Sequence, residues 1–253
     1  MAIHDKMIEG DASPLTFASF QEAFDISKES FCREVFKENK ESIQIKKEKT
    51  AVKNLVRIFD ATFRICAKKG FRGMSMRDLS QESGLSMGGL YAYFSSKDQL
   101  LNTLQRVGTR LVQDILVSCS QQVSCPYLKL ISAIKIHLYL SEMIPDWFFF
   151  SYMEAKSMNK KERDFYKESE LFTESLFLEI LQQGAETGIF EQRDHLMAAS
   201  VIKAMLQDWY LKRWKYTKRH ITVDQYAQFI LEMIESFYLA GPPSPENHPI
   251  WRG

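Results

Sequence analysis

The 253-residue sequence has few of the features that mark secreted, membrane-spanning or disulfide-rich proteins. Its four cysteines include no Cys-x-x-Cys pair, which argues against a disulfide framework. The longest apolar runs, such as the WFFF stretch that begins at Trp147, are far shorter than the ~18 residues needed to cross a bilayer. No secretory signal is evident, so we expect a cytoplasmic protein with reduced thiols and no membrane partner.

Patterns for metal binding and catalysis are missing as well. The five histidines are scattered, and none stands four residues from another His or from a Cys. The sequence also lacks a Gly-x-Ser-x-Gly motif and a phosphate-binding loop. A helical enzyme would need acids, bases or a nucleophile that converge in one pocket. We therefore expect no enzyme activity, no metal and no cofactor.

Strand signals are nearly absent, whereas apolar residues recur at spacings of three and four along most of the chain. This periodicity predicts an all-α fold. The expected helices cover residues 48–69, 76–83, 87–94, 96–118, 126–142, 146–156, 161–187, 194–217 and 222–239.

Charge is distributed unevenly although the net charge is only +1. Residues 45–100 hold 11 Lys/Arg against 5 Asp/Glu, whereas residues 1–44 hold 5 against 9. One segment is therefore basic, which indicates a polyanionic partner for that segment rather than for the whole chain.

The first 45 residues carry large apolar side chains at roughly helical spacing in an acidic background, namely Phe17, Phe20, Phe24, Phe31, Val35 and Phe36. They form either a helical arm that packs on the body or on a partner, or a flexible extension that only solubilises the chain. Disordered segments seldom contain so many phenylalanines, which favours the packed arm.

A helix-turn-helix pattern lies within the basic segment. A long amphipathic helix ends near Gly70, and Ser75 with Asp78 three residues later resembles a capping box that starts a second helix. Gly84 can end that helix in a left-handed conformation, and Ser86 can cap a third helix. This geometry places a recognition helix in the major groove of DNA.

The third helix begins with two adjacent glycines, Gly88 and Gly89, each of which weakens a helix by roughly 1 kcal/mol relative to alanine. A residue without Cβ permits close contact with the phosphate backbone and with base edges. The alternative is that Gly88 lets the third helix pack tightly on the second, and the two interpretations are compatible.

The run IFDATFRICAKKGFRGMSMRDLSQESGLSMGGLYAYFSSKDQLL, residues 58–101, resembles the DNA-binding domain of the TetR family of transcriptional repressors. The resemblance implies an all-helical homodimer with an N-terminal three-helix DNA-reading domain. It also implies a larger C-terminal domain that binds a small molecule and dimerises. The expected parts are a 1–45 extension, a 46–100 DNA-binding domain, a 101–240 effector and dimerisation domain, and a 241–253 flexible tail.

The resemblance also implies which residues contact DNA. Ser75 and Arg77 would begin the second helix, and Tyr91 and Tyr93 would lie on the third, of which spacing allows one tyrosine at most to be buried. Lys97 would bind a phosphate. The full predicted set is Arg64, Arg72, Ser75, Arg77, Ser86, Met87, Gly88, Gly89, Tyr91, Tyr93 and Lys97.

Three positions depart from the common family pattern. Met87 stands where lysine is frequent, Gly89 where threonine or serine is frequent, and Ala92 where histidine is frequent. Each change removes a polar contact. The operator sequence therefore cannot be transferred from a relative.

The chain beyond residue 101 is rich in large apolar side chains. Most belong to ordinary helix packing, and His137 in particular suits a buried core better than a ligand site. A ligand-gated regulator nevertheless needs a cavity, which apolar and aromatic groups line for the most part. The candidate lining residues are His137, Trp147, Phe150, Met153, Phe172, Met205 and Trp209.

The stretch from Lys203 to Gly241 resembles the last two helices of TetR-type regulators, several of which sense acyl-CoA or other lipid-like thioesters. The basic cluster Lys212, Arg213, Lys215, Lys218 and Arg219 suits a CoA phosphate, or is a solvated helix end. The predicted homodimer forms through 194–217 and 222–239 and buries Ile230, Ile234 or Phe237.

Together these features predict a repressor that binds a palindromic double-stranded DNA operator as a homodimer. A small hydrophobic or amphipathic effector would release it by shifting the population toward a conformation that does not fit the DNA. The alternative is a DNA-binding protein without an effector, controlled through protein partners or through the N-terminal arm. A closed core without a pocket would favour that alternative.

Overall fold

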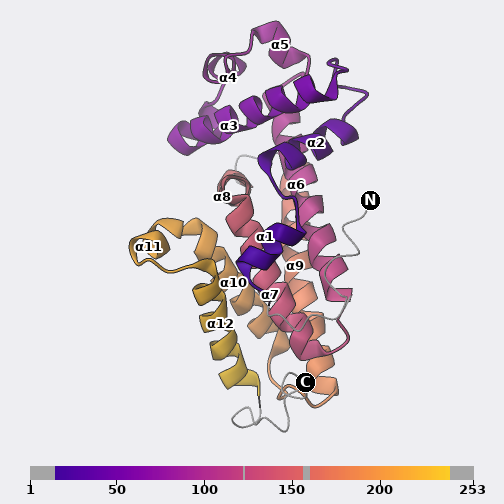
Figure 1. Cartoon of the computed structure of the whole chain (residues 1–253), viewed down its shortest axis with the longest axis vertical. Coiled ribbons are helices and arrows are strands. Elements are labelled where there is room, and N and C mark those ends of the chain that lie inside the picture. The colour runs from indigo at the N-terminus through magenta and orange to yellow at the C-terminus, as the bar shows by residue number, and fades with distance from the viewer. Residues whose placement is uncertain (1–14, 122, 156–159, 240–253) are drawn as a thin grey trace. The chain divides into compact units, whose positions relative to one another are not determined.

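The computed structural model describes residues 15–121, 123–155 and 160–239 (Figure 1). The predicted all-α fold is confirmed, since no strand occurs within these ranges. None of the described helices combines the length and apolar character required to span a bilayer. The helices are α1 (Phe17–Ala23), α2 (Lys28–Glu38), α3 (Glu48–Gly73), α4 (Met76–Ser83), α5 (Met87–Tyr91), α6 (Lys97–Gln121), α7 (Pro126–Met143), α8 (Pro145–Glu154), α9 (Lys160–Glu186), α10 (His195–Leu211), α11 (Arg213–Lys218) and α12 (Val223–Tyr238).

The described residues form two compact units. The N-terminal unit contains Gln21–Ile115 and Leu140–Glu170, and the C-terminal unit contains the segment up to Phe20, Leu116–Tyr139 and the segment from Leu171 onward. This division differs from the predicted boundary at residue 100, because α6 runs on well past that point before the chain enters the C-terminal unit. The predicted tail at 241–253 lies outside the described residues.

Helix α3 forms the centre of the N-terminal unit. Its apolar face is buried along its length, with Leu55 and Ile58 completely inaccessible to solvent. The helix extends past the predicted end at residue 69, because the chain turns at Gly70 (φ 70°) and then resumes one helical turn. Phe71 in that last turn is buried, and Glu154 of α8 accepts a hydrogen bond from its backbone N–H at 3.0 Å.

The N-terminal arm is helical and packed over the part that the structure describes. Phe20, Phe24, Phe31, Val35 and Phe36 are all buried, and Phe17 is half-buried. Ser27 begins α2 with a capping box completed by Ser30. The ring of Phe31 packs edge-on against Phe59 of α3, with the ring centroids 5.9 Å apart. These residues therefore belong to the protein core, as the density of phenylalanines predicts.

The start of the arm packs within the C-terminal unit. The Lys135 ammonium of α7 donates to the Leu15 carbonyl at 2.9 Å, and the Phe17 N–H donates to Asp224 of α12 at 3.1 Å. Phe17 and Phe20 both contact the ring of Tyr139, with centroid distances of 5.6 Å. The segment thereby joins α7 and α12.

The predicted helix at 194–217 is divided into α10 and α11 at Lys212 (φ −122°, ψ 33°). Asp208 near the end of α10 pairs with Lys212 and Lys215, and the Tyr216 hydroxyl donates to it. Trp209 stacks on the Tyr216 ring at 5.0 Å. This cluster pulls α11 back onto α10, so the two helices cannot continue in a straight line.

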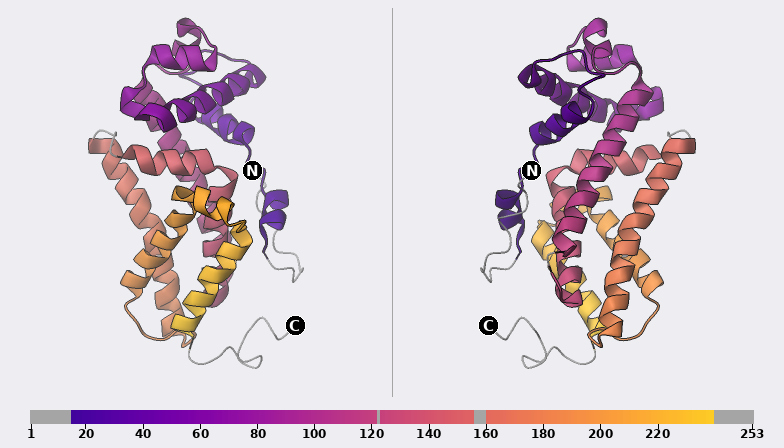
Figure 2. Two further views of the ribbon diagram at one scale, coloured as in Figure 1. Left: turned by 90° about the vertical axis from the view of Figure 1, so that its left-hand side faces the viewer. Right: turned by 90° about the vertical axis from the view of Figure 1, so that its right-hand side faces the viewer.

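Helices α10 and α12 lie side by side in the C-terminal unit (Figure 2). The Tyr226 hydroxyl of α12 donates to the Met205 carbonyl of α10 at 2.7 Å, and the rings of His195 and Tyr238 stack at the other end of the pair. Thr222 starts α12 with a capping box that Gln225 completes. Hydrogen bonds and ring stacking thus fix the pair along its length.

Candidate nucleic-acid interface

The second helix of the predicted motif begins as the sequence indicates. The Ser75 hydroxyl accepts from the Asp78 N–H at 3.1 Å, and Asp78 accepts from the Ser75 N–H at 2.8 Å, so the capping box is complete. Lys69 of α3 places its ammonium 2.8 Å from the same carboxylate. The Lys69 and Ser75 hydrogen bonds hold the pKa of Asp78 well below its usual value. The start of α4 is therefore tied to the end of α3.

The turn after α4 depends on Gly84, which adopts the left-handed conformation (φ 66°, ψ 23°). A Cβ at this position would also lie 2.9 Å from the Arg57 guanidinium. Arg57 of α3 donates to the Ser83 carbonyl at 3.1 Å and to the Gly84 carbonyl at 3.0 Å. These bonds satisfy the carbonyl end of α4 and fix the angle at which the chain enters α5.

Ser86 caps α5, and its hydroxyl accepts from the Gly89 N–H at 3.1 Å. The helix ends at Tyr91, three residues before the predicted end, because the following turn is tighter than an α-helix. The Tyr93 N–H donates to the Leu90 carbonyl at 2.9 Å. Leu90 is completely buried and holds the helix on the unit.

The exposed face of α4 and α5 contains most of the predicted DNA-contacting residues. Met87 is 37% exposed and Tyr91 is 47% exposed, whereas Tyr93 is only 2% exposed. The expectation that one tyrosine is buried and the other exposed is confirmed. The remaining exposed members of the set are Arg64, Arg72, Ser75, Arg77, Ser86 and Gly88, and Gly89 is half-buried.

Tyr93 supports the motif from inside. Its hydroxyl accepts from the Asn54 side-chain amide at 3.0 Å, and burial raises the pKa of the phenol. A buried side chain cannot reach a base edge. The structure thus moves Tyr93 from the predicted contact surface to the core, where it joins α5 to α3.

The two glycines differ in what surrounds them. A Cβ at Gly88 would meet no atom within 4 Å, so tight packing against α4 does not account for this residue. A Cβ at Gly89 would lie 3.2 Å from the Ser86 hydroxyl, close to the N-cap hydrogen bond. Gly89 thus accommodates the cap, while Gly88 faces open space on the exposed side of α5.

Two cations of the predicted DNA-contacting set are engaged within the unit. Arg64 forms an exposed ion pair with Glu82 at 2.7 Å. The Lys97 ammonium donates to the Met74 carbonyl at 2.9 Å and to the Arg72 carbonyl at 3.1 Å, and it lies 5.2 Å from the centre of the Phe71 ring. Lys97 therefore completes the carbonyl end of α3, the end that carries partial negative charge.

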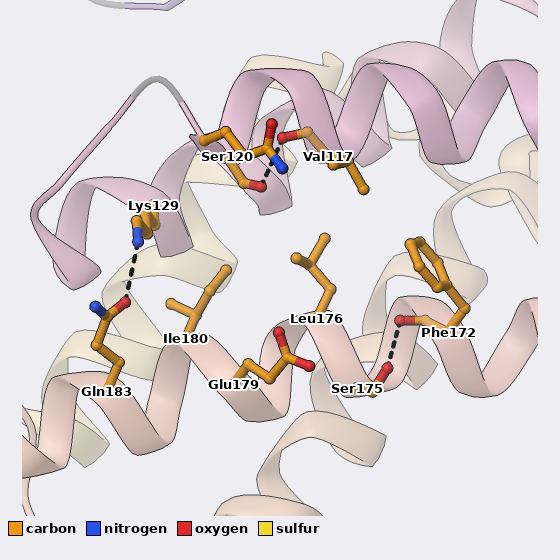
Figure 3. A pocket seen from close by; sticks show the side chains of 10 residues that line it. Val117, Ser120, Lys129, Phe172, Ser175, Leu176, Glu179, Ile180 and Gln183 are labelled. Atoms are coloured by element: carbon orange, nitrogen blue, oxygen red, sulfur yellow. Dashed lines mark hydrogen bonds between the residues drawn. The ribbon is translucent and has the colours of Figure 1, made fainter.

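A cleft of about 280 Å³ opens between the end of α6, the start of α7 and α9 (Figure 3). The Lys129 ammonium and the Gln183 side chain meet across it at 3.0 Å. The other lining residues are Val117, Ser120, Gln121, Phe172, Ser175, Leu176, Glu179 and Ile180. Phe172 is the one predicted pocket residue among them.

Three further residues of the predicted pocket lie in the N-terminal unit, and each has its own packing environment. The Trp147 indole N–H donates to the Leu104 carbonyl at 2.9 Å, and the ring occupies the space left by the absent side chain of Gly108. Phe150 packs edge-on against Phe63 at 5.3 Å. Met153 is 42% exposed. Trp147 and Phe150 are thus packed in the core of the unit, whereas Met153 lies at its surface.

In the C-terminal unit, His137 and Trp209 are completely buried and Met205 is half-buried. The Lys203 ammonium of α10 lies 3.3 Å from His137 Nε2 of α7, and Lys203 is itself buried. Burial and the neighbouring Lys203 charge hold the pKa of His137 well below its usual value. The interpretation of His137 as a core residue agrees with this environment.

Several positioning residues are not evident from the sequence. Arg57 and Asn54 look like ordinary surface residues of an amphipathic helix, yet they hold the turn and Tyr93 in place. Lys203 gives a weak signal, because it interrupts an otherwise apolar stretch of α10. Their partners are distant in sequence, so only the fold reveals them.

Helix α5 is exposed, and α3 and α4 fix its orientation through a capped turn that contains a glycine. This arrangement is a helix-turn-helix of the DNA-binding class. The sequence model of the family described as "Bacterial regulatory proteins, tetR family" matches residues 58–104. Residues 58–104 therefore carry the sequence signature of this family of transcriptional regulators.

Among characterised relatives, the HTH-type transcriptional regulator PksA of Bacillus subtilis (strain 168) is 39% identical over 64 residues. These residues make up 24% of this chain and 31% of PksA, so the similarity spans about a third of that relative. The regulator HbdR of Aromatoleum sp. (strain CIB) is 21% identical over 184 residues, which are 72% of this chain and 80% of HbdR.

A solved structure with the same fold is that of AibR in complex with isovaleryl coenzyme A and operator DNA. It superposes with a TM-score of 0.61 at 21% identity and covers 70% of this chain and 95% of AibR. At this identity the likeness establishes the fold.

Proposed function

We propose that the protein is a transcriptional repressor that binds a palindromic operator as a homodimer and leaves it when a small hydrophobic or amphipathic effector binds. The observation that carries this proposal is the exposed first turn of α5, where Gly88 faces open space and Met87 and Tyr91 project from the same short helix. A helix start whose backbone has no Cβ allows close approach to a groove of duplex DNA. The exposed Arg72 and Arg77 would supply phosphate contacts.

Dimerisation is proposed through α10 and α12. Phe229, Met233 and Phe237 recur every four residues along α12 and are 61%, 48% and 49% exposed. The neighbouring α10 exposes Leu196, Met197 and Val201. An apolar stripe on two adjacent helices is typical of a four-helix contact with a second copy.

The residues expected to be buried in that contact need a correction. Ile230 and Ile234 are 2% and 7% exposed within a single chain, so they pack inside the C-terminal unit. Phe237 stays available to a partner. We therefore keep α12 as the proposed contact helix, with an outward face one position before the predicted isoleucines.

The effector is proposed to be amphipathic, with an acyl-CoA or a similar lipid-like compound as the favoured class. The C-terminal unit is rich in aromatic and aliphatic side chains, and the structurally similar AibR binds isovaleryl coenzyme A according to its description. The basic cluster would be a smaller phosphate site than the sequence indicates, because Lys212 and Lys215 pair with Asp208. Lys218 and Arg219 remain exposed.

The proposal is tested by selection of bound duplexes from a random DNA pool with the purified protein. We expect a palindromic consensus with half-sites roughly 34–36 Å apart, one turn of DNA. Acyl-CoA compounds of increasing chain length are then added to the complex, and at least one should release the DNA. Binding that shows no sequence preference and disappears at physiological salt would refute the assignment.

A further inference from the structure

The segment that joins α2 to α3 meets the carboxyl end of the recognition helix. The Gln44 N–H donates to the Ala92 carbonyl at 2.9 Å, and Ala92 is the residue that directly follows α5. Ile43, the neighbour of Gln44, is completely buried. A main-chain hydrogen bond beside a buried side chain therefore joins the N-terminal arm to the end of α5.

The joining segment is a compact turn rather than a loose loop. The Ile43 N–H donates to the Asn39 carbonyl at 2.9 Å, and the Asn39 side-chain amide donates to the Val35 carbonyl at 2.8 Å. The Lys46 ammonium closes the other side on the Ile43 carbonyl at 3.1 Å. These hydrogen bonds fix the position of Gln44 relative to α2.

Helix α2 is itself fixed within the N-terminal unit. Its last residue, Glu38, receives Arg106 at 2.9 Å and Arg110 at 3.1 Å, both from α6, and the Glu38 side chain is only 18% exposed. Its first residue, Lys28, pairs with Asp60 of α3 at 2.7 Å. Between these ends, Phe31 contacts α3 as described above. The arm thus connects α3 and α6 to the end of α5.

We propose that residues 27–47 are a positioning element, the brace, which sets the orientation of α5 for reading bases. This inference rests on the proposed function and goes beyond it. Helix α5 has only five residues, far fewer than a helix needs for stability of its own, so its orientation must come from tertiary contacts. Arg57 and Ser86 fix its start, and the brace fixes its end through Gln44. When the orientation of α5 is fixed before binding, less conformational entropy is lost when the protein binds DNA.

The first arm of the test needs no DNA. Ile43→Ala removes buried contact, and Gln44→Pro removes the N–H that donates to the Ala92 carbonyl. Amide hydrogen exchange is followed in residues 87–94 with Glu41→Gln, an exposed carboxylate of the same segment, as the control. We expect amide exchange in residues 87–94 to be about tenfold faster than in the wild type for both variants. The exchange rate of the control should be unchanged. Unchanged exchange in both variants would overturn the brace.

The second arm compares affinity for the selected duplex with affinity for a random duplex. For Ile43→Ala, Gln44→Pro and Glu38→Gln, we expect the selected duplex to bind at least tenfold more weakly. Binding to the random duplex and its salt dependence should be unchanged, because phosphate contacts do not require a fixed α5. An equal loss on both duplexes would contradict positioning. A wild-type chain without any sequence preference would refute the proposed function, while the exchange arm would still decide the brace.

Discussion

At the scale of single residues, Gly88 separates what the fold needs from what DNA reading needs. Among the residues that the structure describes, no neighbouring atom lies within 4 Å of the place where its Cβ would stand, and its φ is not positive. Alanine has the higher helix propensity, by up to about 1 kcal/mol. The folded protein therefore gains nothing evident from this glycine.

We predict that Gly88→Ala raises the free energy of unfolding by about 0.5–1 kcal/mol and weakens operator binding at least tenfold, because the added methyl group stands on the face that meets DNA. Denaturant unfolding and DNA titration measure the two effects. Gly73→Ala is the matched control, since its Cβ would meet only the flexible Lys69 side chain at 3.5 Å. Weaker folding with intact DNA affinity would show that Gly88 is structural.

Gly108, unlike Gly88, is required by the packing of its neighbours. Its Cβ would lie 2.1 to 2.5 Å from three atoms of the Trp147 ring, which is fixed by a hydrogen bond to Leu104. We predict that Gly108→Ala lowers the free energy of unfolding by about 1–3 kcal/mol, the usual cost of overpacking. Thermal and denaturant unfolding check this value, and wild-type stability would indicate that Trp147 moves aside.

At the scale of elements, local signals were sufficient for the motif but not for its supports. Ser75 with Asp78, Gly84 and Ser86 can be predicted because each acts within a few residues of its own position. The contacts Gln44–Ala92 and Asn54–Tyr93 join segments that are far apart in sequence, so no local pattern encodes them. The general helix-turn-helix site was therefore predictable, whereas the sequence did not show which of the two tyrosines is buried.

The same limit explains the predicted pocket and the divided helix. An aromatic side chain at helical spacing can fill a core or line a cavity, and only its neighbours decide between them. Trp147 fills the space beside Gly108, which sequence spacing does not reveal. The helical pattern is interrupted at Lys212 because Asp208, before the break, binds Lys212 at the break and Lys215 after it. Such effects depend on packing rather than on propensity.

The contact between α7 and α10 gives a prediction for pH dependence. His137 stays neutral in the folded protein because its pKa is held well below 6.5 by burial and by Lys203, whereas in the unfolded chain it binds a proton below that value. The unfolded state then holds more protons, so the free energy of unfolding decreases as the pH falls from about 6.5 to 5, by at most about 1.4 kcal/mol per pH unit. Denaturant titrations at several pH values measure this slope.

The variant His137→Gln is the control, because it keeps an acceptor for the Lys203 ammonium but does not titrate. We expect its free energy of unfolding to be nearly constant over the same range, even if it is lower overall. A wild-type slope retained in the variant would assign the pH dependence to other groups.

At the scale of the whole molecule, the exposed stripe on α12 predicts a dimer. Met233→Asp places a charge in its centre and should convert the protein to a monomer at micromolar concentration, because a desolvated charge without a partner opposes association. Light scattering after size exclusion gives the mass. Leu171→Asp on α9, at a position 62% exposed, is the matched control and should remain dimeric. A wild-type monomer would remove the basis for a palindromic operator.

If the exposed first turn of α5 enters a groove of duplex DNA, the side chains of this helix must lie against base pairs in the complex. The most direct measurement is photo-crosslinking from a benzoyl-phenylalanine placed at Tyr91, the most exposed side chain of that helix, on the duplex obtained by selection. We expect crosslinks to bases at two symmetric positions about one DNA turn apart. Tight binding of that duplex without any crosslink to its half-sites would show that α5 does not enter the groove.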